Sequence, residues 1–305
     1  MKQIVVLSGK GGTGKTTIAA ALAHLASREM SIVLADADVD AANLELVLAP
    51  EVQESQDFVG GQVAVINPQT CIACGVCAEV CRFGAVVREE NGYRVDRIPC
   101  EGCAACFYQC PANAISMENS VDGRWFQSRT RFGLLFHAHL IAARENSGKL
   151  VSLVKQRARL AALEDHSDLL IVDGPPGIGC PVIAAATGAD LALLITEPTI
   201  SGAHDLARIL ALTEHFRIQA LVCINKADIN PRRAKEVAHF CTERGVPLAG
   251  CLPYDMVVTE AMVHGVPVSE YTDGPVTQEL IRIWQQVKDH VLVRSAETLS
   301  NGYIP

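Results

Sequence analysis

The stretch Gly9-Lys10-Gly11-Gly12-Thr13-Gly14-Lys15-Thr16-Thr17 decides the fold of this chain. It follows a short β-branched run, Lys2–Leu7, and leads into an alanine-rich segment from about Thr16 to Met30. A strand, a glycine-rich loop and a helix in this order form a phosphate-binding loop (P-loop), in which backbone N–H groups and a helix N-terminus face phosphate oxygens. The sequence therefore predicts a nucleotide site at its N-terminal end.

The residues of this loop have separate predicted roles. Lys15 should reach the β- and γ-phosphates, and the Thr16 hydroxyl should bind Mg²⁺. Gly11, Gly12 and Gly14 have no Cβ, so the backbone can wrap tightly around the phosphates. Thr13 and Thr17 complete the predicted nucleotide-binding loop.

Apolar runs and amphipathic segments alternate through most of the chain. Buried strands are predicted at Ser31–Ala35, Leu169–Val172, Leu191–Thr196, Ala220–Asn225 and Leu248–Leu252, with helices near 149–165, 201–215, 231–244 and 275–294. Strands of near-continuous Val, Ile and Leu separated by helices indicate a parallel sheet covered on both faces. We therefore expect an α/β fold with a doubly wound, mainly parallel sheet.

Lys10 adds a lysine early in the loop, so that Gly9 to Thr17 reads G-K-G-G-x-G-K-[ST]-T. With this motif the chain resembles the deviant-Walker P-loop ATPases of the MinD/ParA/Mrp superfamily, which includes the nitrogenase iron protein. The resemblance covers about four-fifths of the chain. It implies that Lys10 reaches across a two-fold interface to the nucleotide of a partner subunit; a solvated loop lysine is the alternative.

Two aspartates at predicted strand ends complete the expected catalytic set of Lys10, Lys15, Asp38 and Asp173. The resemblance places Asp38 in switch I, near Mg²⁺ and the attacking water. Asp173 opens Asp173-Gly-Pro-Pro-Gly177, which matches a Walker B aspartate followed by a switch II glycine that senses the γ-phosphate. Plain strand-end aspartates are the alternative.

The stretch Asn225-Lys226-Ala227-Asp228 resembles a purine-recognition loop. In MinD-like proteins the matching asparagine contacts adenine, and a later Pro-Tyr-Asp, here Pro253-Tyr254-Asp255, lies nearby. N-K-x-D is also the pattern of guanine-specific loops, so GTP is the alternative to ATP.

Residues 60–119 break the strand and helix rhythm and contain two cysteine tetrads. The spacing C-x2-C-x2-C-x3-C occurs in both, and it is typical of bacterial ferredoxins with two [4Fe–4S] clusters, in which the fourth cysteine of each run binds the other cluster. The predicted ligands are Cys71, Cys74, Cys77 and Cys110 for cluster one, and Cys100, Cys103, Cys106 and Cys81 for cluster two. Zinc is the alternative, although four cysteines within eleven residues cannot form two separate C-x2-C knuckles. We therefore predict a small α+β ferredoxin-like domain inserted into an ATPase domain of residues 1–59 and 120–305.

Several other side chains are predicted to be structural. Cys223, Cys241 and Cys251 lie in apolar surroundings and are expected in the core. Cys180 is expected to be a buried or helix-capping thiol; the nitrogenase iron protein has a cluster ligand at the matching offset, but its second such cysteine has no counterpart here. His137 and His139 share one face of a strand and do not make a metal site by themselves. The C-terminal helix has an expected core stripe of Leu280, Ile281, Ile283, Trp284 and Val287.

Composition excludes several classes of protein. A net charge of -8 over 305 residues argues against a general nucleic-acid surface. The apolar runs are too short to span a bilayer, and the first strand runs directly into the P-loop, which does not fit a signal peptide. Twelve cysteines then indicate metal ligands in a reducing compartment, and we expect a cytoplasmic protein that uses neither membrane nor nucleic acid.

One chain thus combines a nucleotide switch with an electron-transfer module. The leading hypothesis is an Mg-dependent ATPase, slow alone, that couples ATP to electron transfer through two [4Fe–4S] clusters. A homodimer or a heterodimer with a paralogue is expected, together with a redox partner protein. An iron–sulfur carrier or assembly ATPase, and a positioning ATPase with structural clusters, are the alternatives.

Overall fold

The computed structural model describes residues 1–141 and 146–293, which divide into two compact units. The large unit comprises Met1–Ser55, Trp125–His139 and the chain from Ser147 onward. The cysteine unit comprises Gln56–Arg124 and Leu140–Asn146. Each unit is described by itself below.

The described strands of the main sheet follow the order β11-β10-β9-β1-β8-β2-β7-β6-β3. Their bounds are β1 Lys2–Ser8, β2 Ile32–Asp36, β3 Glu51–Ile66, β6 Ile115–Arg129, β7 Leu134–Leu140, β8 Leu169–Pro176, β9 Leu191–Thr196, β10 Gln219–Ile224 and β11 Leu248–Cys251. All neighbouring pairs from β11 to β7 are parallel, which confirms the mainly parallel α/β sheet. Of the strands predicted from sequence, Leu191–Thr196 has the observed bounds, and the others start within one residue.

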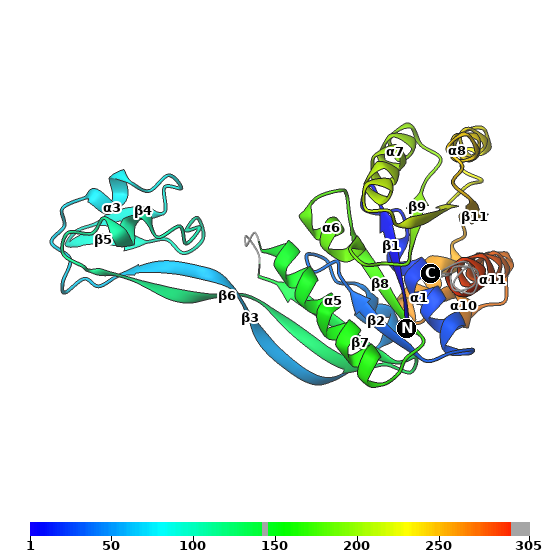
Figure 1. Ribbon diagram of the computed structural model, residues 1–305, viewed down its shortest axis with the longest axis horizontal. Coiled ribbons are helices and arrows are strands. Elements are labelled where there is room, and N and C mark those ends of the chain that lie inside the picture. Colours follow the sequence, from blue (N-terminus) through cyan, green and yellow to red (C-terminus); the bar gives the residue numbers. More distant parts are fainter. Residues whose placement is uncertain (142–145, 294–305) are drawn as a thin grey trace, which may run out of the picture. The chain divides into compact units, whose positions relative to one another are not determined.

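Helices cover both faces of this sheet (Figure 1). Their bounds in the large unit are α1 Lys15–Ser27, α2 Leu44–Leu48, α5 Ser147–Glu164, α6 Cys180–Ala186, α7 Ile200–His215, α8 Pro231–Glu243, α9 Val257–Val263, α10 Val268–Tyr271 and α11 Pro275–Lys288, followed by a π-turn, η1 Asp289–Val293. Ile4 and Val6 of β1 pack in one core cluster with α1 and α11, and the alternate residues Val5 and Leu7 are equally buried. Because successive strand residues point to opposite faces, both faces of β1 are covered.

The C-terminal helix differs from the expectation in two respects. Its α-helical part ends at Lys288, and residue 294, the expected end, lies outside the described residues. Leu280, Ile283, Trp284 and Val287 are buried as expected, but Ile281 is wrong as a core residue because it is 47% exposed. Its position in the 3.6-residue period turns it away from the core. Within the described ranges, no helix has the length and apolar character needed to cross a bilayer.

The strands β3 and β6 were not predicted from the sequence. They run through the large unit's boundaries at Ser55 and Trp125 and continue into the cysteine unit. The first seven residues of β3 are all exposed, so they lack the apolar alternation by which a half-buried strand is recognised. The sequence instead predicts an insert that begins at residue 60 and ends at residue 119.

The cysteine unit has a small core and little regular structure. Its elements beyond β3 and β6 are the hairpin β4 Val86–Glu89 and β5 Gly92–Val95, with single-turn helices α3 Val76–Glu79 and α4 Ala105–Tyr108. A cluster of five buried residues, Ala64, Cys77, Ala85, Val95 and Ile115, forms its centre. A core of this size needs an additional source of stability, which bound metal commonly supplies in small domains.

Candidate functional site

A large cavity lies at the carboxyl edge of the parallel strands in the large unit. Its volume is about 770 Å³. The strand order changes direction at β1, whose neighbours are β8 and β9, and ligands of open α/β sheets bind at such a point. The predicted nucleotide-site residues that line the cavity are Gly11, Gly12, Gly14, Lys15, Thr16, Thr17, Asp38, Asn225, Lys226, Pro253 and Asp255.

The P-loop backbone is held in the shape that phosphate binding requires. Gly14 is the N-cap of α1 and has a left-handed conformation (φ 91°). A Cβ at this position would lie 2.5 Å from the side-chain nitrogen of Asn225, so only glycine fits. The same Asn225 nitrogen donates a 2.8 Å hydrogen bond to the Thr13 carbonyl. The Asn225 side chain therefore closes the loop from the β10 end.

Three neighbouring carboxylates, those of Asp36, Asp38 and Asp173, interact electrostatically. Asp36 and Asp173 are register partners on β2 and β8, and both are fully buried. Burial, and then the charge of Asp173, raises the pKa of Asp36 well above its usual value. The Asp36 carboxylate accepts hydrogen bonds from the backbone N–H groups of Asp38 and Leu44, which orders the segment that carries Asp38.

Asp173 has the electrostatics of a cation ligand. Burial raises the pKa of Asp173 to about 7, although the Thr16 hydroxyl and the charge of Lys15 act in the opposite direction. Neither carboxylate oxygen of Asp173 has a well-aligned hydrogen-bond donor within the described residues. A buried carboxylate in this state is costly unless a cation neutralises it, and carboxylate and hydroxyl oxygens suit Mg²⁺. Thr16, Asp38 and Asp173 therefore fit a magnesium ion.

Lys10 lies beside the cavity rather than in its lining. Its ammonium is 3.0 Å from one carboxylate oxygen of Glu197, at the end of β9, and the Lys226 ammonium is 2.7 Å from the other. Lys10 also approaches the hydroxyls of Thr199 and Ser201 at 3.5 and 3.4 Å. Glu197 thus pairs with two lysines, one of which is part of the P-loop. No sequence pattern points to Glu197, because a single acid after a strand has no motif of its own.

The expected base-recognition residues come from two neighbouring strand ends. Asn225 and Lys226 follow β10, and Pro253, Tyr254 and Asp255 follow β11. Asp228, which a guanine-specific loop would use, accepts a 2.7 Å hydrogen bond from the Tyr254 backbone N–H. Its carboxylate therefore joins the two loops that carry the expected base-recognition residues.

The remaining predicted site residues lie outside the cavity lining. The Thr13 side chain is buried under the loop, and Asp173 is buried below the lining. Gly177 has φ 94°, and its N–H donates to the Ser8 carbonyl at 2.9 Å, which joins the segment after β8 to the start of the P-loop. Asp40, which was not among the predicted site residues, is exposed and belongs to the cavity lining.

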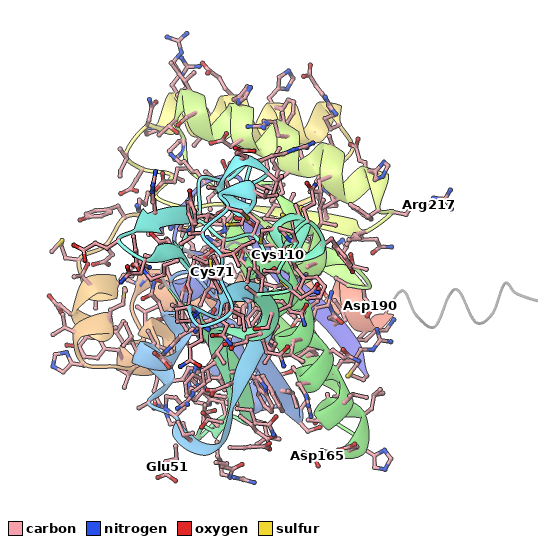
Figure 2. All side chains as sticks on the ribbon, turned by 90° about the vertical axis from the view of Figure 1, so that its left-hand side faces the viewer. Glu51, Cys71, Cys110, Asp165, Asp190 and Arg217 are labelled. Carbon is pink, nitrogen blue, oxygen red and sulfur yellow. The ribbon has the colours of Figure 1, made fainter. Side chains whose placement is uncertain are left out.

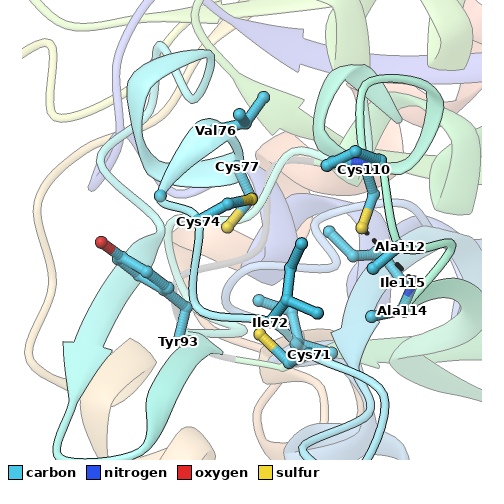
Figure 3. Close-up of a pocket in the computed structure, with 13 residues that line it drawn as sticks. Cys71, Ile72, Cys74, Val76, Cys77, Tyr93, Cys110, Ala112, Ala114 and Ile115 are labelled. Atoms are coloured by element: carbon cyan, nitrogen blue, oxygen red, sulfur yellow. Dashed lines mark hydrogen bonds between the residues drawn. The ribbon is translucent and has the colours of Figure 1, made fainter.

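The eight cysteines of the two tetrads all lie in the cysteine unit, where Figure 2 labels Cys71 and Cys110. The structure brings them together as two groups of four, each lining its own cavity. One cavity is lined by Cys71, Cys74, Cys77 and Cys110, and the other by Cys81, Cys100, Cys103 and Cys106. Figure 3 shows the four sulfurs of the first group pointing toward one another. Each group thus takes three thiols from one repeat and the fourth from the other.

The two repeats have the same backbone shape. Positive φ angles occur at Ala73 and Gly102, at Gly75 and Ala104, and at Gly84 and Asn113, each pair separated by 29 positions. These left-handed residues let the chain turn sharply around each group of thiols.

The sulfur environment is also repeated. The Ala85 N–H donates to Cys81 Sγ at 3.4 Å, and the Ala114 N–H donates to Cys110 Sγ at 3.3 Å. Burial raises the pKa of the Cys77 and Cys106 thiols, so their thiolates need a cationic partner. Four thiols around one cavity are the donor set of a soft metal centre, and both an iron–sulfur cluster and zinc fit this chemistry.

Two of the other cysteines are placed differently from the predictions. Cys223 and Cys241 are buried core residues as expected. Cys251 is wrong as a core residue because it is exposed at the end of the edge strand β11. Cys180 is neither buried nor a cap: it is the exposed first residue of α6, whose N-cap is Gly179.

The fold and the site together define a P-loop nucleotide-binding protein. The family description "CobQ/CobB/MinD/ParA nucleotide binding domain" matches residues 4–268. The chain belongs to this family and is a P-loop ATPase.

Individual relatives agree with this placement. An uncharacterised protein of Methanocaldococcus jannaschii is 35% identical over 75% of this chain and 79% of its own length. An ATP-binding protein of the same organism is 27% identical over 92% of this chain and 85% of its own. The septum site-determining protein MinD of Pyrococcus horikoshii, solved with Mg-ADP, has a TM-score of 0.58 at 19% identity, with 94% of this chain and 95% of that chain covered. At 19% identity, the likeness to the Pyrococcus horikoshii structure shows a shared fold only.

Proposed function

We propose that this chain uses ATP binding and hydrolysis to control electron transfer from two [4Fe–4S] clusters in the cysteine unit to a partner protein. The observation that carries the proposal is the pair of cavities, each lined by four cysteines, in a unit whose chain is inserted between Asp38 and Asp173. Residues 60–119 would form the ferredoxin-like domain. When bound, the clusters would supply one-electron redox chemistry.

The residues of the large unit support the nucleotide half of this function. The P-loop N–H groups and Lys15 would bind the phosphates, while Thr16 and Asp173 hold Mg²⁺. Asp38, whose pKa is raised mainly by burial and lowered by Lys15, would orient the attacking water. Gly177, with its open left-handed turn, would sense the γ-phosphate. Related structures of MinD with Mg-ADP and of Cyanothece McdA with ATP support these ligands.

A partner subunit would complete the site. Lys10 would leave Glu197 and contact the nucleotide bound to a second copy of this chain or to a paralogue. The Aquifex aeolicus MinC:MinD complex supports assembly with a further protein, which here would be the electron acceptor or donor. The strand that leads into the cysteine unit, β3, begins at Glu51, and two residues separate it from the end of α2. A movement of the Asp38 segment would be transmitted along it.

The test is an anaerobic comparison of nucleotide states. The protein should contain about eight iron and eight sulfide per chain, and its rate of reduction by dithionite or of electron transfer to a soluble acceptor should change with Mg-ATP but not with Mg-ADP. Lys15→Ala should abolish the ATP effect without loss of iron. Stoichiometric zinc without sulfide would contradict the proposal. Intact transfer of iron and sulfide to an apo-ferredoxin would identify a carrier, and redox rates indifferent to nucleotide would identify structural clusters.

A further inference from the structure

A second cluster of potential metal ligands lies in the large unit, outside the nucleotide cavity. His137 and His139 are two apart on β7 and therefore share one face of the strand. Glu45 comes from α2, 94 residues away from His139 in sequence. One Glu45 carboxylate oxygen lies 3.0 Å from His137 Nδ1, and the other lies 3.1 Å from His139 Nε2. One nitrogen from each histidine and a carboxylate oxygen of Glu45 all lie within 4.8 Å of one another.

The buried side chain of His137 directs its Nδ1 atom toward the Glu45 carboxylate. His137 is only 2% exposed, and its Nε2 is 3.0 Å from the Ser128 hydroxyl. Its Nδ1 has no well-aligned hydrogen bond within the described residues, although the Glu45 oxygen is close. If Nε2–H donates to Ser128, Nδ1 carries a lone pair beside a carboxylate. Two acceptors at 3.0 Å are stabilised by a cation between them.

The ring planes of both histidines are held by one aromatic side chain. Phe126 on β6 stacks on His137 with centroids 5.0 Å apart and an interplanar angle of 20°. It also packs against His139 at 5.2 Å. Ligands that are oriented before binding lose little conformational entropy when the ion arrives.

We propose that Glu45, His137 and His139 bind a divalent transition-metal ion, for which zinc is the best fit. Two imidazoles and one carboxylate are a common three-residue zinc donor set, with water in the fourth tetrahedral position. The His139 side chain is 50% exposed, which opens that position to solvent. Tetrahedral bonds of about 2.0–2.1 Å separate ligand atoms by roughly 3.4 Å, so small side-chain movements are sufficient. Ser128 acts as the outer partner that sets the His137 tautomer.

The site would connect the ion to the nucleotide switch. Glu45 follows Leu44, whose backbone N–H donates to Asp36, and the segment between Asp36 and Leu44 carries Asp38. An ion bound by Glu45 of α2 would fix the Leu44 end of this segment. Its other ligands lie on β7, which pairs with β2, the strand that ends at Asp36. The inference stands independently of the redox proposal, because it uses residues of the large unit only.

The test titrates Zn²⁺ into anaerobically prepared full-length protein, followed by calorimetry and by zinc X-ray absorption. We expect one zinc per chain with a nitrogen and oxygen shell near 2.0–2.1 Å, and no competition from millimolar Mg²⁺. His139→Ala and Glu45→Gln should weaken binding at least about tenfold, and Ser128→Ala about tenfold. His204→Ala is the matched control, because that exposed histidine pairs only with Asp205 in the contacts found for it.

Two outcomes would overturn the proposal. A shell of sulfur at 2.3 Å would assign the zinc to cysteines. Equal affinity in His139→Ala and wild type, or no binding at micromolar zinc, would leave a hydrogen-bonded histidine–glutamate cluster only. Fluorescence of the buried Trp125 and Trp284 in the large unit checks that each variant is folded.

Discussion

Glu197→Gln tests whether the ion pair with Glu197 competes with the proposed contact of Lys10 to the nucleotide of a partner subunit. The Glu197 carboxylate contacts the ammonium groups of Lys10 at 3.0 Å and Lys226 at 2.7 Å. Burial would raise the pKa of Glu197, but hydrogen bonds from the two lysines lower it below its ordinary value. The charge of Glu197 is therefore stabilised by both contacts, and glutamine removes that charge while keeping the side-chain shape.

This substitution should destabilise the folded chain but strengthen its ATP-dependent association. The lysine side chains are 31% and 32% exposed, and pairs of this exposure contribute about 1 kcal/mol each. Losing both should lower the free energy of unfolding by about 2 kcal/mol and the melting temperature by roughly 3 °C. In the proposed two-fold dimer, one Lys10–Glu197 contact would break in each subunit. Removing that competition should tighten ATP-dependent association by about 2 kcal/mol, or roughly 30-fold.

Differential scanning fluorimetry and sedimentation equilibrium with a non-hydrolysable ATP analogue measure the two quantities. Glu270→Gln is the control, because Glu270 pairs with Arg131 elsewhere in the large unit and its loss should lower stability without changing association. A Glu197→Gln protein that melts earlier and also associates more weakly would refute the reasoning, since Glu197 would then support the interface rather than compete for Lys10.

Four further outcomes are expected. Lys15→Ala should weaken Mg-ATP binding at least about 100-fold in equilibrium dialysis, whereas Lys10→Ala should keep affinity and lose association; identical phenotypes would indicate a general loop defect. Asp38→Ala should bind ATP but hydrolyse it at least about tenfold more slowly in a phosphate-release assay, and a wild-type rate would remove its switch role. Cys110→Ala should lose about four of eight iron atoms while nucleotide binding persists; full iron content would exclude it as a ligand. Burial lowers the pKa of His137 to about 4 from 6.5, so the unfolded chain binds more protons between these values. Stability of the zinc-free protein, followed by tryptophan fluorescence in urea, should therefore fall by up to about 3 kcal/mol as pH drops through this window, and His137→Gln should flatten the profile.

The strand ends were the most predictable part of the site. The P-loop that carries Lys15 follows the apolar run Lys2–Leu7, and Asp173 follows the apolar run Leu169–Val172. The carboxyl ends of parallel strands meet at one edge of the sheet, so the two side chains were expected there. The polar strand β3 could not be predicted, because its first residues from Glu51 onward are exposed and show no period. Ile281 and Cys251 were placed in the core because they are apolar, and their exposure depends on which face of α11 and which edge of the sheet they occupy.

The sequence by itself determined the chemistry that each segment can perform. Glycines that allow left-handed turns at Gly12 and Gly14, and thiols at repeated spacing, are local properties that survive in any packing. Only the tertiary structure decided which distant groups meet. Glu197 faces Lys10 because β9 pairs with β1, and Glu45 faces His139 although 94 residues separate them. Strand order depends on covering both faces of the sheet, and no local spacing encodes that requirement.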